Sequence, residues 1–216
     1  MNPCHDTSDQ SSSLISGQSS PHKRASETGL EAFLGAEDDG HHWLLVADRD
    51  GSLLPFTQMR VRAHELQSTP LPGERLILVE NERCLHQLPR VSGTVSVLGS
   101  GLNLSWLNAT WLKDRATAYW GDIDTWGLTM LASARKHLPL LTPLLMDRIT
   151  FDTFADASGV EEPQPAPSIT PPGLTGSEAK LYQRLRQADR GRLEQEFLPV
   201  CVVHRAIGDW VDRSAE

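Results

Sequence analysis

Two aspartates stand one residue apart behind an aromatic pair, in a pattern that suits metal or phosphate chemistry. The stretch YWGDIDTWG, residues 119–127, contains Asp122 and Asp124, and an earlier apolar run, LILV, ends directly before Glu80. Residues two apart on an extended chain point to the same side, so the two aspartate carboxylates are expected to lie close together and to repel one another. A cation or a proton between them would remove this repulsion.

Magnesium is the cation that these side chains favour. Mg²⁺ prefers oxygen ligands from a few carboxylates, completed by water or phosphate, and the neighbouring sequence offers no thiolate or imidazole that would favour zinc. A short Asp-x-Asp stretch is more often a solvated turn, which is the alternative interpretation.

Alternating strands and helices are predicted to position these acids. The apolar run over residues 75–79 predicts a buried strand, followed by a polar corner and a short helix that ends at Pro89. Further patterns predict strands over residues 93–101, 116–121 and 141–147, the last ending at Asp147, and helices over 103–114 and 126–138. This order favours an α/β fold with a mainly parallel sheet flanked by helices, in which the carboxyl ends of the strands share one crevice.

Composition shifts predict four segments. Residues 1–38 are polar and too poor in apolar side chains to offset the entropy of ordering them, which predicts a disordered tail. The core is expected over residues 39–155. Residues 156–173 are dense in proline and predict a mobile loop or linker, and residues 174–216 predict a helical segment packed on the core.

Local signals mark the start of two of these segments. Asp50 and Gly51 lie between two short apolar runs and predict two strands of a hairpin, or of a sheet edge, at the beginning of the core. Thr175 and Glu178 have the spacing of a capping box, which predicts that a helix starts there.

Composition also narrows the class of protein. The 216 residues include 20 Lys and Arg against 28 Asp and Glu, so bulk positive charge does not favour nucleic-acid binding, although a local basic patch is not excluded. The three cysteines are far apart and form no CxxC group, which fits a reducing cytoplasm. No window approaches the length and apolarity of a membrane span, so a cytoplasmic protein is expected.

The acidic motifs resemble those of the Toprim domain, the metal-binding module of topoisomerases, primases and related nucleases. Its strand-end glutamate and its later Asp-x-Asp, often with a glycine three residues on, match Glu80, Asp122, Asp124 and Gly127. The closer resemblance is to JetD, the Toprim nuclease subunit of Wadjet anti-plasmid systems, which is similar to the A subunit of topoisomerase VI. It rests on five phrases in the order that family shows: LVENERCLHQLP, YWGDIDTWGLTML, LLMDRITFD, LTGSEAKLYQRL and GRLEQEFLP.

The resemblance implies a Toprim-like fold and an Mg²⁺-dependent DNA endonuclease that hydrolyses phosphodiesters in plasmid defence. Asp122 and Asp124 would hold Mg²⁺, or Mn²⁺ in its place, against a phosphate oxygen, and Glu80 would complete the ligand set or accept a proton from the attacking water. Tyr119 and Tyr182 are predicted to be packing residues, which favours hydrolysis by water over attack by a tyrosine. The implied partners are double-stranded DNA and condensin-like SMC subunits, with a homodimer left open.

Further charged residues are weaker candidates. Asp147, Glu194 and Glu196 could serve a second metal ion or surround the first, or could simply pair with nearby arginines. The best basic cluster for DNA phosphates, with a solvated helix face as the alternative, consists of Arg184, Arg186, Arg190 and Arg192.

A second function remains open. A typical JetD protein has a sizeable N-terminal region that includes a winged-helix-like DNA-binding portion, whereas here only the polar tail precedes the matching phrases. The alternative is therefore a truncated, non-catalytic Toprim-fold interaction or remnant domain that needs an absent N-terminal DNA-binding half.

Overall fold

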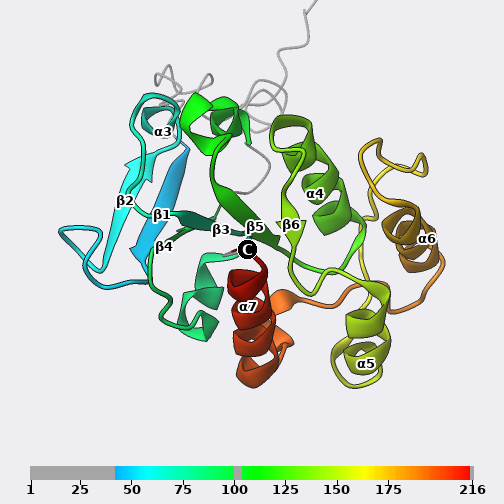
Figure 1. The fold of residues 1–216 in the computed structure, drawn as a ribbon. Helices are drawn as coiled ribbons and strands as arrows, with labels where there is room; N and C mark the ends of the chain where they lie inside the picture. Colours follow the sequence, from blue (N-terminus) through cyan, green and yellow to red (C-terminus); the bar gives the residue numbers. More distant parts are fainter. Residues whose placement is uncertain (1–41, 100–103, 215–216) are drawn as a thin grey trace, which may run out of the picture. The chain divides into compact units, whose positions relative to one another are not determined.

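The computed structural model describes residues 42–99 and 104–214, and its centre is a six-stranded sheet in the order β2-β1-β4-β3-β5-β6 (Figure 1). The tail predicted for residues 1–38 lies outside the described residues. The strands are β1 (Trp43–Asp48), β2 (Gln58–Arg62), β3 (Arg75–Val79), β4 (Thr94–Leu98), β5 (Ala116–Trp120) and β6 (Thr142–Pro143).

The sheet is parallel from β4 to β6, whereas β1 runs antiparallel to both β2 and β4. The inner strands β3, β4 and β5 are buried almost along their whole length, as expected for parallel strands covered on both faces. Strand β2 at the edge alternates between half-buried and exposed residues. The predicted α/β fold with a mainly parallel sheet is confirmed, and the predicted strand over residues 75–79 coincides with β3.

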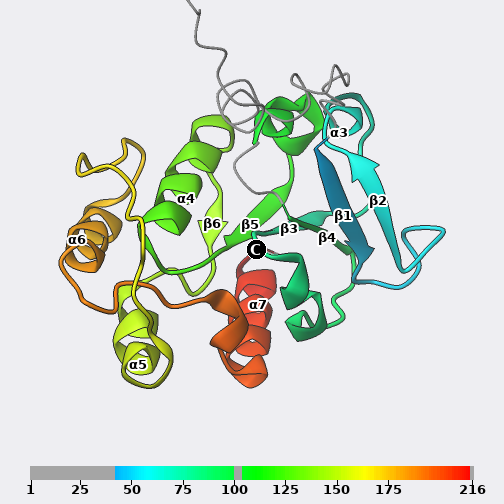
Figure 2. The ribbon, with the colours of Figure 1, turned by 180° about the vertical axis from the view of Figure 1, so that it is seen from behind.

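Helices cover both faces of the sheet. Figures 1 and 2 show α4 and η2 on one side of the sheet, with α7 and η1 on the other, and α5 and α6 beside one another past β6. The α-helices are α3 (Glu65–Ser68), α4 (Thr125–His137), α5 (Arg148–Ser158), α6 (Gly176–Leu185) and α7 (Val200–Ser214). The 3₁₀ helices are η1 (Glu82–Gln87), η2 (Ser105–Asn108), η3 (Thr110–Leu112) and η4 (Gln195–Phe197). No helix among the described residues is both long and apolar enough to cross a membrane.

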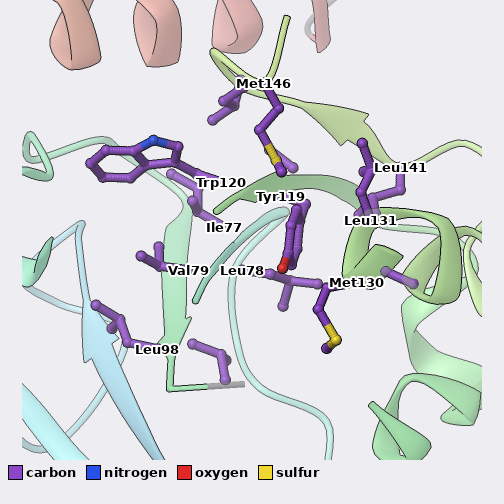
Figure 3. Packing of buried hydrophobic residues seen from close by; sticks show 14 of the residues in the cluster. Ile77, Leu78, Val79, Leu98, Tyr119, Trp120, Met130, Leu131, Leu141 and Met146 are labelled. Atoms are coloured by element: carbon purple, nitrogen blue, oxygen red, sulfur yellow. The ribbon is translucent and has the colours of Figure 1, made fainter. Parts of the chain in front are cut away.

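The apolar core holds the carboxyl ends of β3 and β5 in place. Figure 3 shows Tyr119 and Trp120 leaving β5 in different directions, with Tyr119 extending toward Met130 of α4. Both aromatic residues are only 1% exposed, and Ile77 and Val79 of β3 are fully buried beside them. Burial on this scale makes these strand ends a rigid support for the residues that follow them.

Two elements of the structure differ from those predicted from the sequence. The helix expected over residues 103–114 is two 3₁₀ turns, η2 and η3. The strand expected over residues 141–147 is reduced to the two residues of β6, because Pro143 has no N–H for the ladder and Leu145 has a positive φ of 60°.

Asp147 therefore ends no strand. It is the N-cap of α5 instead, where its side chain accepts a hydrogen bond of 2.8 Å from the backbone N–H of Thr150.

The proline-rich segment is packed rather than separating two bodies. Helix α5 extends to Ser158, so the loop begins later than the predicted residue 156. The N–H of Ala166 donates to Oγ1 of Thr125 at 2.6 Å, and the hydroxyl of Tyr182 donates to the carbonyl of Pro167 at 2.6 Å. Residues on both sides of the loop belong to one compact unit, His41–Glu216.

The predicted hairpin and capping box are confirmed. β1 and β2 pair around a loop in which the carboxylate of Asp48 accepts four backbone hydrogen bonds, including one from Gly51 at 2.7 Å. At the start of α6, the side chains of Thr175 and Glu178 each accept from the other's backbone N–H.

Candidate metal centre

Glu80 and Asp122 meet because β3 and β5 are parallel neighbours whose carboxyl ends lie at the same edge of the sheet. The carboxylate oxygen Oε2 of Glu80 accepts a hydrogen bond of 3.3 Å from the hydroxyl of Tyr119. The same oxygen accepts one of 3.4 Å from the backbone N–H of Asp122. One donor in β5 and one just after it thus fix the position of a carboxylate that follows β3.

Two glycines allow this close approach. A Cβ atom on Gly121 would lie 2.5 Å from Oε2 of Glu80, and one on Gly127 would collide with the backbone carbonyl of Asp122. The glycines of the YWGDIDTWG stretch are therefore a steric requirement for bringing β3, β5 and the start of α4 together.

Asp124 turns the chain from β5 into α4. It is the N-cap of this helix, and its Oδ1 accepts a hydrogen bond of 2.6 Å from the N–H of Gly127. Asp122 is 8% exposed and Asp124 is 5% exposed, so the alternative of a solvated turn is wrong.

One guanidinium contacts both aspartates. Arg192 places an Nη atom 3.0 Å from Oδ2 of Asp122 and its Nε 3.4 Å from Oδ2 of Asp124. The same Nη atom lies 3.2 Å from a carboxylate oxygen of Glu194. A single cation therefore faces three carboxylates, with Glu80 as a fourth nearby.

The backbone on either side of Arg192 is anchored to the site. Ile123 and Leu193 exchange two backbone hydrogen bonds, of 2.9 and 3.1 Å, as an isolated antiparallel bridge. The N–H of Gln195 donates to Oδ1 of Asp122 at 2.9 Å. These bonds hold the segment that carries Arg192 against the end of β5.

The carboxylates carry more negative charge than Arg192 balances. Burial, together with the charges of Asp122 and Asp124, raises the pKa of Glu80 to about 7. Burial also raises the pKa of Asp124, to about 6; the charges of Asp122 and Glu162 add to this, and the hydrogen bond from Gly127 and the charge of Arg192 oppose it. The site therefore favours a proton or an additional cation near neutral pH.

A cleft of about 580 Å³ opens beside these groups. Its lining residues are Glu80, Asn81, Glu82, Arg83, Gly99, Asp122 and Arg192. Oxygen ligands and excess negative charge fit Mg²⁺ in chemical type. Within the part of the chain that the structure describes, however, no three Asp, Glu, His or Cys side chains are grouped closely enough to hold a metal ion together. In this arrangement the positive charge beside Asp122 and Asp124 is the guanidinium of Arg192.

Two of the three weaker acidic candidates lie near the site. Glu194 contacts Arg192, and Oε1 of Glu196 accepts a hydrogen bond of 3.4 Å from the side chain of Asn81, the residue after Glu80. Asp147 is exposed and caps α5, and within the described residues no hydrogen bond or ion pair joins it to the other acids.

The four predicted arginines do not form one cluster. Arg192 lies among the aspartates, whereas Arg184 pairs with Asp152 at 2.7 Å. Arg186 donates to the carbonyl of Ala166, and Arg190 donates to backbone carbonyls at the end of α5 and just after it. Contact of these side chains with DNA phosphate stays a prediction.

Glu162 is a member of the site that sequence patterns did not indicate. Its carboxylate accepts hydrogen bonds from the backbone N–H of Thr125 at 3.3 Å and from the hydroxyl of Thr125 at 2.6 Å, at the first residue of α4. It lies in the proline-rich loop, where no periodic pattern marks a residue that folds back onto a helix. Sequence patterns also gave no indication of the pairing of Arg192 with the aspartates, because 70 residues separate Arg192 from Asp122.

The two tyrosines are buried, as predicted. Tyr182 uses its hydroxyl to hold the proline-rich loop, and Tyr119 uses its hydroxyl to hold Glu80. Burial and the charge of Glu80 raise the pKa of Tyr119 well above its ordinary value. Neither side chain is placed as an accessible nucleophile.

A family model described as Wadjet protein JetD, C-terminal, matches residues 29–207, which is well over half of the chain. The chain belongs to this family. A search of curated proteins found no match.

Membership of the JetD C-terminal family confirms the resemblance seen in the five sequence phrases and ties the chain to the Wadjet plasmid-defence system. It also implies a complex with other Wadjet subunits. The match contains every acidic residue of the candidate centre.

Proposed function

We propose that the chain is the Mg²⁺-dependent nuclease domain of a Wadjet-type system and hydrolyses phosphodiester bonds of double-stranded DNA. The observation that carries this proposal is the excess of carboxylates at the shared carboxyl edge of β3 and β5, where Asp122, Asp124 and Glu194 contact one arginine and Glu80 lines the same open cleft. Carboxylates with strongly raised pKa values beside a cleft are a common feature of active sites.

Glu80 and Asp122 both line the cleft and would hold Mg²⁺, with Asp124 as a further ligand. When bound, Mg²⁺ would supply positive charge to a phosphate oxygen as the phosphodiester is attacked, and Mn²⁺ would serve in its place.

Glu80 also has the properties of a general base. In the metal-free chain its pKa is about 7, close to neutral pH, so Glu80 would accept a proton from an attacking water where it is not itself a ligand of the metal. Tyr119 and the backbone N–H of Asp122 hold one of its oxygens in a fixed direction. Because Tyr119 is buried and holds Glu80, water is the attacking group in this mechanism.

DNA must be delivered to an acidic chain. The formal net charge of −8 opposes the approach of a polyanion, and the arginines of the C-terminal segment are largely engaged in internal hydrogen bonds. We therefore assign DNA positioning mainly to the condensin-like SMC subunits, in a cytoplasmic complex. For the chain itself we propose a Toprim-like topology of the kind found in the topoisomerase VI A subunit.

The test is cleavage of supercoiled plasmid in Mg²⁺ or Mn²⁺, with the other Wadjet subunits present. We expect the wild-type chain to produce nicked or linear DNA and the Asp122→Asn variant to lose at least about a hundredfold in rate. Asp152→Asn is the matched control, because it removes a carboxylate that pairs with an arginine outside the cleft. Equal cleavage by wild type and Asp122→Asn would contradict the assignment.

A non-catalytic role is the second candidate, and the position of Arg192 favours it. An arginine that permanently neutralised Asp122 and Asp124 would leave a stable fold without a metal, suited to binding other subunits. In that case the wild-type chain would neither bind Mn²⁺ nor cleave DNA, even in the assembled complex.

A further inference from the structure

We propose that Arg192 is an exchangeable counter-ion of the metal centre: its guanidinium and a divalent cation occupy Asp122 alternately, so that loading of the metal requires the arginine to leave. The inference rests on the proposed metal-dependent function and adds a control on when that site is filled.

The first support is competition for the same atom. Oδ2 of Asp122 lies 3.0 Å from an Nη atom of Arg192, and Oδ1 of the same carboxylate accepts from the N–H of Gln195 at 2.9 Å. Both oxygens are therefore engaged, and a cation that binds Oδ2 would lie directly beside the guanidinium. Two positive charges at this distance would also repel each other strongly in a partly buried site.

The second support is the incomplete hydrogen bonding of the guanidinium. Nε of Arg192 is buried and has no hydrogen-bond partner among the described residues, since its 3.4 Å approach to Asp124 is an ion pair without hydrogen-bond geometry. A buried N–H that makes no hydrogen bond is costly, so the paired state of Arg192 is weaker than its number of acidic neighbours suggests.

The third support is a path for the side chain. One third of the Arg192 side chain is exposed, and the carboxylate of Glu194, 24% exposed, already lies 3.2 Å from its Nη atom. The guanidinium can therefore rotate toward solvent while it keeps an ion pair with Glu194.

The backbone does not have to move for this exchange. Leu193 is tied to Ile123 by two backbone hydrogen bonds, and Gln195 is tied to Asp122 through its own N–H. None of these bonds uses the side chain of Arg192. A change of rotamer is therefore sufficient.

The test is calorimetric titration with Mn²⁺ on the full chain. We expect Arg192→Gln to bind Mn²⁺ about tenfold more tightly than wild type, because a competing positive charge is removed. Arg192→Lys keeps the charge and is expected to stay within about threefold of wild type. Arg184→Gln is the matched control: it removes an arginine that pairs with Asp152, and its affinity for Mn²⁺ should equal that of wild type.

A second measurement on the wild-type chain covers the case in which Arg192→Gln does not fold. The NMR signal of the Arg192 Nε–H, assigned by its loss in Arg192→Lys, should shift on titration with Mg²⁺ and move toward the position of a solvated arginine. An unmoved signal in the metal-bound protein would overturn the exchange.

The outcomes separate this inference from the proposed function. If wild type binds Mn²⁺ and Arg192→Gln binds it equally or more weakly, the exchange is wrong while the metal assignment stands. If neither variant nor wild type binds Mn²⁺, both are wrong. If Asp122→Asn binds as well as wild type, the metal lies elsewhere and Arg192 does not compete for it.

Discussion

Two partly buried arginines of this molecule face carboxylates, and they do so in opposite ways. Arg135 of α4 meets the single carboxylate of Glu178 through two hydrogen bonds, of 2.5 and 2.9 Å. Burial works against the charged form of Glu178, but the hydrogen bonds from Arg135 and Thr175 lower its pKa below the ordinary value. Arg192, in contrast, is shared among Asp122, Asp124 and Glu194.

The difference shows what separates a structural ion pair from a candidate active site. The Arg135 pair is balanced, because one guanidinium meets one carboxylate through two hydrogen bonds. This pair joins α4 to the capping box of α6. The Arg192 group has several anions for one cation, and burial together with the neighbouring carboxylate charges raises the pKa values of Glu80 and Asp124. Burial is common to both, so charge balance is the feature that distinguishes them.

The largest effect on stability is expected from breaking the balanced pair. Arg135→Gln leaves the charge of Glu178 buried without its partner, which should lower the free energy of unfolding by about 3 to 5 kcal/mol at pH 7. Urea denaturation measures this. The double variant Arg135→Gln, Glu178→Gln should recover part of the loss, and a loss under about 1 kcal/mol for the single variant would show that the pair is not a structural support.

An opposite effect is expected at the unbalanced site, and it depends on pH. The pKa of Glu80 is about 7 in the folded chain against an ordinary value of 4.5, so the folded state holds this proton more tightly than the unfolded state. The stability that the protonated carboxyl contributes is complete below about pH 4.5 and is lost as the pH rises through 7.

Glu80→Gln should therefore be more stable than wild type at pH 8 by about 1 to 3 kcal/mol, in the absence of divalent metal. At pH 4 the two proteins should be nearly equal. Denaturation at both pH values tests this, and part of the pH dependence should persist because the pKa of Asp124 is also raised. If the free energy of unfolding depended on pH in the same way in both proteins, burial and neighbouring charges would not raise the pKa of Glu80.

The smallest effect is expected at an exposed pair. Arg184 and Asp152 lie 2.7 Å apart, but their side chains are 47% and 36% exposed. Solvent screens such pairs, so Arg184→Gln should change the free energy of unfolding by no more than about 0.5 kcal/mol. Thermal denaturation of this variant beside Arg135→Gln checks the ranking. A loss of stability as large as that of Arg135→Gln would show that burial does not determine how much an ion pair stabilises the fold.

The parts of the fold that were predictable are those with local signals. The apolar run of β3 and the capping box of Thr175 and Glu178 depend on neighbouring residues alone, and both were placed correctly. The short β6 was over-extended because the positive φ of Leu145 has no signature in a non-glycine residue.

The candidate site was predictable in its acids but not in its cation. Glu80, Asp122 and Asp124 stand at strand ends that the sequence indicates, and the parallel pairing of β3 with β5 brings the first two together. The partner of the aspartates lies 70 residues further along the chain, in a segment without a periodic pattern. Charge pairing over that distance follows from the completed fold, so single-sequence patterns could not reveal it.

The long sequence separation of these contacts has a consequence for the order of folding during synthesis. The apolar strands β3, β4 and β5 leave the ribosome well before Arg192, and Asn81 waits for Glu196, 115 residues later. Until then the carboxylates at the strand ends have no arginine partner, and contacts between distant residues form slowly. The nascent chain should therefore keep this edge of the sheet open until the segment that carries Arg192 and Glu196 is made.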